Sequence, residues 1–461
     1  MEKNQRNYKR NYERKDKRKM QKLNEKCKKY IEENYEENVS SGRKVLDYLD
    51  QSTAKYKGET IYSLYLPKIF TEEAKNVIKE AAETMYQILI KVMKEYIRSA
   101  SYRKLFDLDK DLEKMILNVP DYDNLLPIAR VDIFLNEEDY SYKFCEFNAD
   151  GCSSMNEDRE LNIAFQKSVV YEELNKTYHL HSFELFDTWA EELEKIYKTD
   201  SVYVPNAHIA IVDFLEKGCS MEEFEEFRKA FERKGFTAEV CEIRELSYDG
   251  KHLYTKSGRQ IDVIYRRAVT SDILAKKNEV QDFLKAVEEK KVCLIGNFCT
   301  QIIHDKIIFE VLHLPETYAL LNEEEIAFIK AHIPHTVRLT TETIEEYNVA
   351  DTKDEWIIKP EDSYGAKGIF DGKKYSLKEW KEILEQHKNK DYLLQEYVTP
   401  YKSDNIDCKK EHPEFIKYSN LTGLYLYNGK FSGVYSRQSA KEIISTEYDE
   451  NDIGSLWAEE R

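Results

Sequence analysis

The stretch IARVDIFLNEEDYSYKFCEFNADG, residues 128–151, decides the fold. Two runs of β-branched, aromatic and aliphatic residues flank the polar segment 136–140, and this pattern predicts a β-hairpin. Side chains of a strand alternate between its two faces. The alternation therefore gathers one set of side chains on a common face of the hairpin: Arg130, Asp132, Phe134, Phe144, Glu146 and Asn148.

The register of this hairpin brings two carboxylates together. Antiparallel pairing centred on residue 139 sets Asp132 opposite Glu146, Arg130 opposite Asn148, and Phe134 opposite Phe144. Like charges directly opposite one another destabilise a sheet unless a counter-charge intervenes. Two carboxylates and one amide oxygen suit Mg²⁺, which prefers hard oxygen ligands.

We therefore expect Asp132, Glu146 and Asn148 to be magnesium ligands, with Arg130 directed at an anion held nearby. The alternative is an ordinary exposed hairpin with one charged face. The sequence of this stretch alone leaves both interpretations open.

Two lysines follow farther along the chain. The segment 296–313 predicts that Lys306 lies early in a helix, where the alternative is an ordinary surface pair with Asp305. Lys359 ends the apolar strand WIIKP, and an ammonium group facing inward there requires an anion. Gly365 and Gly368 follow in a loop that lets backbone amides approach phosphates, although the loop is not a Walker A sequence.

The C-terminal third contains further strands. YLLQEYV, residues 392–398, predicts a strand that leads into a segment able to offer backbone groups to an adenine edge; the alternative is a simple buried strand. Residues 421–437 predict a hairpin that turns at Asn428-Gly429 and ends at Arg437, which in isolation is more often structural. The polar segment 401–414 predicts an exposed loop.

The remaining patterns predict helices and a parallel sheet. A helix is expected over 71–100, with Thr71 as its cap and apolar residues at helical spacing. Residues 208–295 alternate between strands and helices, including one helix over about 272–290, which is typical of a small Rossmann-like α/β domain. GxGxxG is absent, so a dinucleotide site is not supported.

Composition bounds the class of protein. The 461 residues carry 70 Lys and Arg against 87 Asp and Glu, a net charge of −17, so we expect neither nucleic acid nor an anionic membrane to be bound by the bulk surface. Residues 1–20 form a basic arm. Its two interpretations are a solvated helix and a segment that binds an acidic partner. No secretory or membrane-spanning pattern and no zinc-type cysteine spacing occur, so we expect a cytoplasmic protein.

Taken together, these motifs resemble the circularly permuted ATP-grasp superfamily, and within it the glutathionylspermidine synthase-like group without its amidase domain. The matching segments are RVD…EFNAD (130–150), NFCTQIIHDK (297–306), IIKPEDSYGAKG (357–368), LLQEYV (393–398) and VYSR (434–437). The acidic hairpin precedes the lysines, which is the order of the permuted group. IDVIYRR, residues 261–267, also resembles a segment of that group.

The resemblance implies a mixed α+β and α/β fold with a permuted ATP-grasp core. Its expected parts are a helical N-terminal region with a basic arm (1–120), a first core segment with the metal hairpin (121–200), a Rossmann-like preATP-grasp domain (201–300) and a second core segment (301–461). The continuation GCSSMNED after the hairpin departs from the family pattern, which leaves the substrate contacts there open.

The resemblance also implies an ATP- and Mg²⁺-dependent ligase that joins a carboxylate to an amine through an acyl phosphate, with a possible homodimer. Each motif would then carry a role: metal ligation by Asp132, Glu146 and Asn148; phosphate contacts by Lys306 and Lys359; a lid at Gly365 and Gly368; an adenine hinge at Gln395, Glu396, Tyr397 and Val398; and stabilisation of the transferred phosphoryl group by Arg130 and Arg437. Two alternatives remain open: a non-catalytic nucleotide-binding scaffold, and a phosphotransferase with a stable phosphorylated product.

Overall fold

The computed structural model describes residues 19–56, 58–216, 218–362, 368–444 and 449–461. Gly365 and all but the last two residues of the predicted basic arm lie outside these ranges. Within them, no helix is both long enough and apolar enough to cross a membrane.

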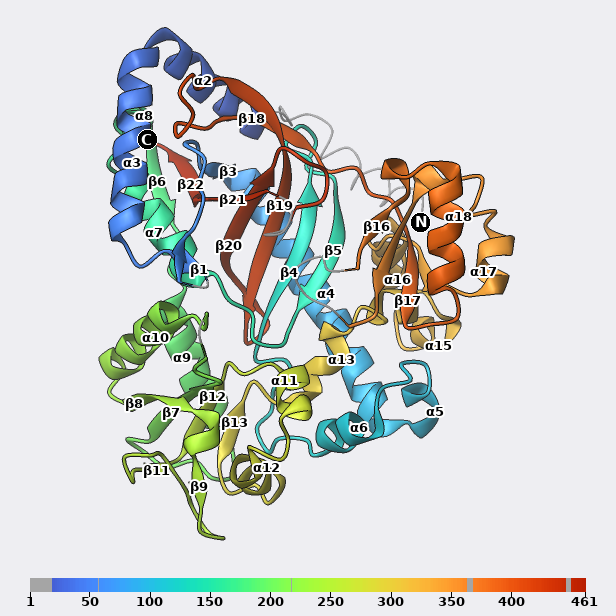
Figure 1. The fold of residues 1–461 in the computed structure, drawn as a ribbon. Helices are drawn as coiled ribbons and strands as arrows, with labels where there is room; N and C mark the ends of the chain where they lie inside the picture. Colours follow the sequence, from blue (N-terminus) through green and yellow to red (C-terminus); the bar gives the residue numbers. More distant parts are fainter. Residues whose placement is uncertain (1–18, 57, 217, 363–367, 445–448) are drawn as a thin grey trace, which may run out of the picture.

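A six-stranded antiparallel sheet forms the centre of the molecule (Figure 1). Its spatial order is β21-β20-β19-β4-β5, and β18 pairs with a further part of β19. Its strands come from two distant parts of the chain: β4 (Ile128–Leu135), β5 (Tyr142–Asn148), β18 (Lys402–Ile406), β19 (Phe415–Tyr427), β20 (Lys430–Ser439) and β21 (Glu450–Ile453). The hairpin that the sequence predicts is therefore completed by strands from the C-terminal third.

The register of the β4–β5 hairpin is confirmed at its charged positions, since Arg130 lies opposite Asn148 and Asp132 opposite Glu146. The predicted pairing of Phe134 with Phe144 is wrong. A bulge places Cys145 as an extra residue in β5, so that Phe144 faces Ile133 instead. The bulge lies directly beside Glu146. It shifts the pairing of residues 142–144 with β4 by one position.

The predicted hairpin at residues 421–437 is confirmed as β19 and β20. Asn428 and Gly429 connect the two strands with φ angles of 49° and 80°. Two positive φ angles define the turn whose twist suits a two-residue hairpin, and Asn-Gly is its preferred sequence. The predicted exposed loop at 401–414 is wrong in its first part, because residues 402–406 form β18 and Ser403 and Asn405 are buried in a side-chain network with Gln438.

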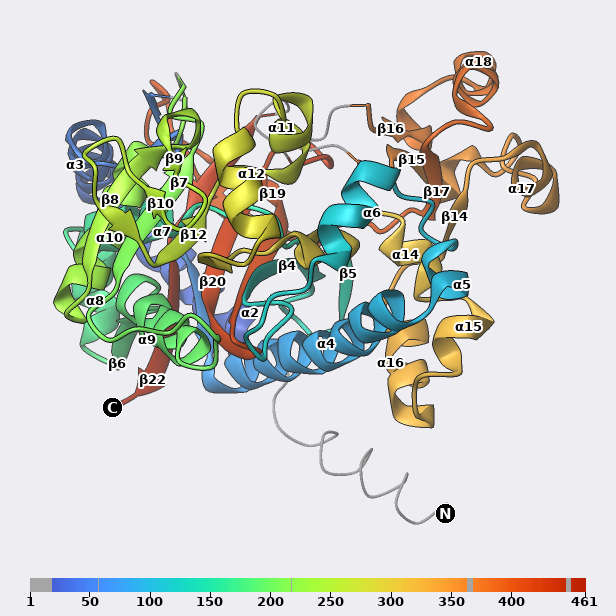
Figure 2. The same ribbon diagram turned by 90° about the horizontal axis from the view of Figure 1, so that it is seen from below.

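The long helix α4 (Glu72–Arg98) confirms the helix predicted over residues 71–100. The Thr71 side chain accepts a hydrogen bond from the Ala74 amide and caps the helix. Its apolar face, which includes Ile88 and Leu89, is fully buried against the central sheet (Figure 2). Helix α4 therefore packs against β19 and β20 and covers one face of the sheet there.

A four-stranded parallel sheet forms a second unit, drawn in green and yellow-green in Figure 1. Its spatial order is β13 (Cys293–Ile295), β12 (Val263–Arg266), β7 (His208–Asp213) and β8 (Thr237–Glu242). Helices α9 (Phe186–Tyr197) and α10 (Met221–Arg233) pack on one face, and α12 (Gln281–Glu288) packs on the other. This arrangement confirms the strand–helix alternation, although the helix expected over 272–290 is divided into α11 (Thr270–Ala275) and α12.

A third unit carries a smaller antiparallel sheet, drawn in orange in Figure 1. Its spatial order is β14 (Thr336–Arg338), β17 (Tyr392–Glu396), β15 (Trp356–Pro360) and β16 (Phe370–Asp371). Trp356, Trp380 and Leu394 belong to its own hydrophobic core. The helices of this part of the chain are α13 (Gln301–His304), α14 (Ile308–Val311), α15 (Pro315–Tyr318), α16 (Glu323–His332), α17 (Thr341–Glu346) and α18 (Leu377–His387).

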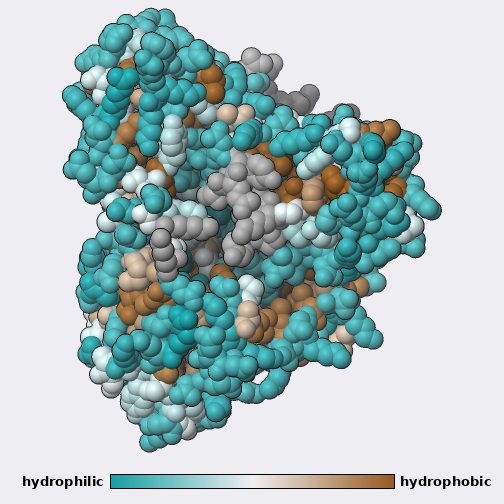
Figure 3. Space-filling model, viewed as in Figure 1, coloured by the Kyte–Doolittle hydropathy of each residue, from teal (hydrophilic) through white to brown (hydrophobic). Residues whose placement is uncertain are grey.

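The remaining elements surround these sheets. β22 lies between β3 and β6 in a three-stranded sheet, and β9, β10 and β11 form a second small antiparallel sheet. Their bounds are α2 (Lys19–Glu33), α3 (Tyr35–Gln51), β1 (Lys55–Tyr56), β2 (Glu59–Thr60), β3 (Lys68–Thr71), α5 (Ala100–Arg103), α6 (Lys110–Leu117), α7 (Met155–Phe165), α8 (Val169–Asn175), β6 (Tyr178–Ser182), β9 (Ser247–Tyr248), β10 (Leu253–Tyr254), β11 (Gln260–Ile261) and β22 (Ser455–Glu460). The visible outer surface is largely hydrophilic (Figure 3).

The packing of α4 yields a stability prediction. Leu89→Ala removes a fully buried side chain and should lower the free energy of unfolding by about 2–5 kcal/mol, because it leaves a cavity between α4 and its neighbours. Lys94→Ala, on the exposed face of the same helix, should change it by less than about 0.5 kcal/mol. Urea unfolding followed by circular dichroism measures both; an equal loss in the two variants would contradict the packing described.

Candidate active site

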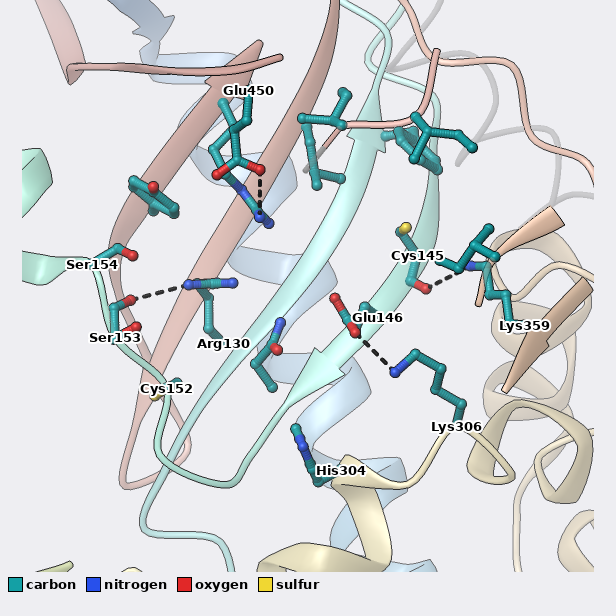
Figure 4. A pocket seen from close by; sticks show the side chains of 18 of the residues that line it. Arg130, Cys145, Glu146, Cys152, Ser153, Ser154, His304, Lys306, Lys359 and Glu450 are labelled. Atoms are coloured by element: carbon teal, nitrogen blue, oxygen red, sulfur yellow. Dashed lines mark hydrogen bonds and ion pairs between the residues drawn. The ribbon is translucent and has the colours of Figure 1, made fainter. Parts of the chain in front are cut away.

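One cavity of about 550 Å³ gathers most of the residues singled out in the sequence. It lies where β4 and β5 of the central sheet meet β15 and β17 of the smaller sheet, with further walls from the loop after β5 and from residues 56–62. Figure 4 shows its interior. The predicted site residues that line it are Arg130, Glu146, Asn148, Lys306, Lys359, Gln395, Glu396, Tyr397, Val398 and Arg437.

Two predicted residues are placed differently. Asp132 is fully buried beside the cavity rather than on its wall. Gly368 is exposed with a φ of 73°, a conformation that favours glycine, but it does not line the cavity. The role proposed for Gly365 lies outside the described residues.

Both lysines approach the cavity from the side of β5 (Figure 4). The Lys306 Nζ lies 3.1 Å from Oε1 of Glu146, and the Lys359 Nζ donates to the Cys145 carbonyl at 3.5 Å. The predicted helical position of Lys306 is wrong, because Asp305 adopts an extended conformation and ends α13. Lys306 therefore lies in the connection between α13 and α14, where its amide donates to the Glu361 carbonyl at 2.9 Å.

Glu146 is held as an anion by this arrangement. Burial alone raises the pKa of a carboxyl group, but the charges of Lys306 and Lys359 outweigh that effect and lower the pKa of Glu146 from its ordinary value of 4.5 to about 2. The side chain is therefore ionised throughout the neutral range and available as an anionic ligand.

Asp132 is compensated by two arginines. Its Oδ1 accepts from Arg130 Nε at 2.9 Å and its Oδ2 from a second Arg130 nitrogen at 3.2 Å. Arg437 reaches the same Oδ2 from β20, and the Asn148 amide donates to it at 3.3 Å. The two carboxylates do lie opposite each other, but the protein's own cations neutralise them, so the like-charge argument by itself does not require a metal.

The donor set nevertheless fits a hard divalent cation. Asp132 and Glu146 lie opposite each other on neighbouring strands, and Asn148 lies two residues beyond Glu146, so the set contains two carboxylates and one side-chain amide oxygen. Glu146 and Asn148 already face the cavity. Across the described residues, no group of three or more His, Cys, Asp or Glu side chains is arranged to hold a metal; the set identified in the hairpin contains only two carboxylates.

The predicted hinge segment lies at the end of β17. Gln395 is buried and donates to Thr336 Oγ1 at 2.9 Å, so its side chain fixes the sheet. The amides of Glu396 and Tyr397 donate to the carbonyls of His335 and Glu355. These two amides are thus used within the fold, while all four residues from Gln395 to Val398 still line the cavity.

The parallel sheet anchors the loop that follows β5. Asp150 accepts from the Thr270 amide at 2.6 Å and pairs with Arg266 at 2.7 Å. Arg267 pairs with Glu223 at 2.6 Å, and Glu223 also accepts from the first amide of α7, that of Met155. These buried contacts explain why the segment IDVIYRR ends in two arginines, and they set the position of the cavity wall at residues 150–154.

Several cavity residues were missed by the sequence analysis. They are Tyr56, Tyr62, Ser153, Ser154, Glu157, His304, Tyr435 and Asp452. Ser153, Ser154 and Glu157 directly follow the decisive hairpin, and His304 precedes Lys306 by two positions, so proximity to a recognised motif could have indicated them. Tyr56, Tyr62 and Asp452 carry no such signal, because only the tertiary fold brings them to this wall.

A family model described as glutathionylspermidine synthase preATP-grasp matches residues 30–447. The chain belongs to this family. The match extends beyond the motifs of the hairpin, the lysines and β17, and it includes most of the N-terminal helical region. A search of curated proteins finds no significant match.

One solved structure agrees at the level of the fold. The family member described here is similar to a glutathione synthetase-like effector, GSS30, from Globodera pallida, with a TM-score of 0.60, 12% identity, and coverage of 90% of this chain and 96% of that one. A protein from Methylobacillus flagellatus described as a "putative gamma-glutamylcysteine synthetase" matches with a TM-score of 0.32 and 8% identity over 85% of this chain and 90% of that one. The D-cycloserine synthetase DcsG matches with a TM-score of 0.29 and 14% identity over 55% and 75%.

Gly423 of β19 provides a test of the Arg130–Asp132 contact. A Cβ at this position would stand 2.7 Å from Arg130 Cδ and 2.8 Å from Asp132 Oδ1. Gly423→Ala should therefore displace the pair and cost about 1–3 kcal/mol of stability. If the Mg·ATP site expected from the sequence lies here, the affinity for Mg·ATP should also fall about tenfold or more. Gly433→Ala, which would meet Phe183 and Leu185 in the connection between β6 and α9, should cost stability without changing nucleotide affinity. Calorimetric titration with Mg·ATP distinguishes the two variants. Equal affinities in both would contradict a nucleotide site beside Arg130 and Asp132.

The low pKa of Glu146 makes stability depend on pH. A folded-state pKa below the unfolded value contributes stability that is present above the unfolded pKa and is lost as pH falls. This stability is lost as the pH falls from 4.5 to about 2. The difference in unfolding free energy between wild type and Glu146→Gln should be smaller by about 1 kcal/mol at about pH 4 than at about pH 6. Urea unfolding at both values checks this; a pH-independent difference would contradict the ion pairing.

Proposed function

We propose that this protein is an ATP-dependent carboxylate–amine ligase with a circularly permuted ATP-grasp core, which forms an amide through an acyl phosphate and releases ADP and phosphate. The observation that carries this proposal is the β4–β5 hairpin, whose oxygen ligands lie between two lysines on one side and two arginines on the other. Membership of the synthetase family supports it.

The permutation proposal rests on chain order. The hairpin with the proposed metal ligands, at residues 128–148, precedes the sheet with Lys359 and the proposed adenine hinge. The parallel sheet within residues 201–300 would then be the preATP-grasp domain inserted between the two core segments, 121–200 and 301–461. The helical region 1–120 would support the core through α4.

Nucleotide would bind on the side of β5 and β17. Lys306 and Lys359 supply positive charge where the phosphates would lie, and Mg²⁺ held by Glu146 and Asn148 would supply charge neutralisation at the phosphate oxygens. Asp132 would join the metal ligands when Arg437 releases its Oδ2. Because the amides of Glu396 and Tyr397 are used within the sheet, the adenine edge would contact Val398 and the carbonyls of this segment.

The acid substrate would bind on the other side of the hairpin. Its carboxylate oxygen attacks the γ-phosphorus of ATP, the bond to the β,γ-bridging oxygen breaks, and ADP leaves. Arg130 and Arg437 line the cavity and would stabilise the charge on the transferred phosphoryl group, since catalysis of such reactions depends on positioning and electrostatics. An amine then attacks the carbonyl carbon, the amide C–N bond forms, and phosphate leaves.

The proposal predicts dependence on Glu146. Glu146→Ala should lower ADP release from Mg·ATP, in the presence of pooled carboxylates and hydroxylamine, by about a hundredfold or more, because it removes an anionic metal ligand. Glu138→Ala, in the exposed turn of the same hairpin, is the matched control and should retain activity. Mass spectrometry identifies the hydroxamate formed from the activated acid.

Other outcomes would redirect the assignment. Retained turnover in Glu146→Ala would contradict the metal site. Binding of Mg·ATP by the wild type without ADP release over the whole panel would favour a nucleotide-binding scaffold. A stable phosphorylated acid that persists when amines are added would indicate a phosphotransferase.

A further inference from the structure

Two buried carboxyl groups line the cavity on the side of the sheet opposite the lysines. Glu157 comes from the first turn of α7 and is 4% exposed, and Asp452 comes from β21 and is 8% exposed. β21 is the edge strand farthest from β5 in the central path of the sheet. Asp452 therefore lies at the edge of the sheet opposite β5, beside which the two lysines lie. The proposed phosphate contacts use neither carboxyl group.

Asp452 is held at the cavity by its neighbours. The Tyr435 hydroxyl donates to Asp452 Oδ1, and the Asp452 amide donates to the Tyr62 carbonyl at 2.9 Å. In the β20–β21 ladder Asp452 lies opposite Arg437, whose guanidinium is directed to Asp132 and, at 3.5 Å, to Glu450. Asp452 thus stands next to the arginine proposed to hold the acyl phosphate, and that arginine is already paired.

One carboxylate oxygen of Glu157 lacks a partner. Its Oε2 is buried and has no hydrogen-bond partner among the residues that the structure describes. Arg267 is the cation whose charge acts on Glu157, and it is paired with Glu223 at 2.6 Å. Its neighbour Asp158 gives the contrast: Asp158 accepts from the Ser455 amide at 3.0 Å and from Asn162 at 2.9 Å, and it does not line the cavity. A purely structural role accounts for Asp158 and leaves Glu157 unexplained.

The charges around the pair favour a retained proton. Burial, and then the carboxylates of Glu223 and Asp452, raise the pKa of Glu157. Burial, and then Glu450, raise the pKa of Asp452, against the opposing effects of the Tyr435 hydrogen bond and of Arg437 and Arg130. The two carboxyls come from α7 and β21, which pack against each other, and both line the same cavity. Each therefore keeps its proton to a higher pH than an exposed carboxyl does.

The proposed reaction requires a base at this side. An alkylamine arrives as an ammonium ion, because its pKa is about 10, and its nitrogen has no lone pair for attack until a proton leaves. General bases act best when their pKa lies near the working pH. Among the cavity residues, Lys306, Lys359, Arg130 and Arg437 are cations, and Glu146 is committed to the proposed metal site. His304 lies on the side of Lys306 (Figure 4), and Glu450 is paired with Arg437.

We propose that the Glu157–Asp452 pair is the general base of the amide-forming step. This inference rests on the ligase function proposed above and assigns the amine subsite to this end of the cavity, for a primary amine that arrives protonated. One carboxylate oxygen of the pair takes a proton from the ammonium nitrogen. The freed lone pair attacks the acyl carbon, the C–O bond to phosphate breaks, and the second nitrogen proton leaves with phosphate as hydrogen phosphate. The pair then returns its proton to solvent.

Hydroxylamine separates this role from a structural one. It is largely unprotonated at neutral pH, so it attacks an acyl phosphate without a base. Wild type, Asp452→Asn and Glu157→Gln are compared with Mg·ATP, a pool of amino acids, dicarboxylic acids and short peptides, and either hydroxylamine or a pool of alkylamines. Amide formation from alkylamines should fall about a hundredfold in both variants, while hydroxamate formation should stay within about threefold of wild type. Glu459→Gln, an exposed carboxylate on β22, is the matched control and should leave both unchanged.

The pH dependence gives a second readout. The wild-type rate with alkylamines should rise as the pair loses its first proton and then level off. In the variants the rate should keep rising about tenfold per pH unit, because only the free amine fraction reacts, so the defect should shrink toward alkaline pH. A structural defect would not shrink in this way.

The outcomes separate the two proposals. Loss of amide with retained hydroxamate supports the base. Equal loss of both products, or retention of both, overturns the base and leaves the ligase function standing. If the wild type yields neither ADP nor hydroxamate with any pooled acid, the ligase function itself fails, and the assigned base fails with it.

Discussion

The site depends on one buried charge and the two cations that neutralise it. Asp132 has no exposed surface, and removing its partners would leave an unpaired carboxylate in the interior, at a cost of about 3–5 kcal/mol. Arg130 lies two residues away on the same strand, but Arg437 lies on β20, with β19 between them. The ion cluster therefore forms only when β4, β19 and β20 are aligned in register, and it ties the geometry of the cavity to that of the whole sheet.

The middle strand has to leave room for this cluster. At the position of β19 opposite Asp132 the residue is Gly423, and the side chains of Arg130 and Asp132 occupy the space that a Cβ would fill. Beside this cluster, Glu146 pairs with Lys306, and Glu450 lies 3.5 Å from Arg437, so each of these two acids also has a cation next to it.

Local patterns predicted the elements whose determinants are local. The Thr71 cap, the Asn428-Gly429 turn and the charged register of the β4–β5 hairpin follow from neighbouring residues alone. The bulge at Cys145 could not be predicted, since it adds one residue without any change of composition. Strand β18 was missed because its buried polar residues resemble a loop until the side-chain network with Gln438 is known. Glu157 and Asp452 reach the same cavity only through tertiary structure, so no spacing in the sequence indicates them.

The strand order also constrains how the chain can assemble. Residue 132 pairs with residue 423, so the pairing edge of β4 has no partner until the C-terminal third of the chain has left the ribosome. Such non-local pairing slows folding, because the chain loses the entropy of a long loop before the favourable contacts between the strands form. In the meantime α4 and the β4–β5 hairpin can associate, but the edge of β4 stays available to other strands. The same topology that places two arginines on one carboxylate therefore makes the nascent chain dependent on reaching its last strands before the site can exist.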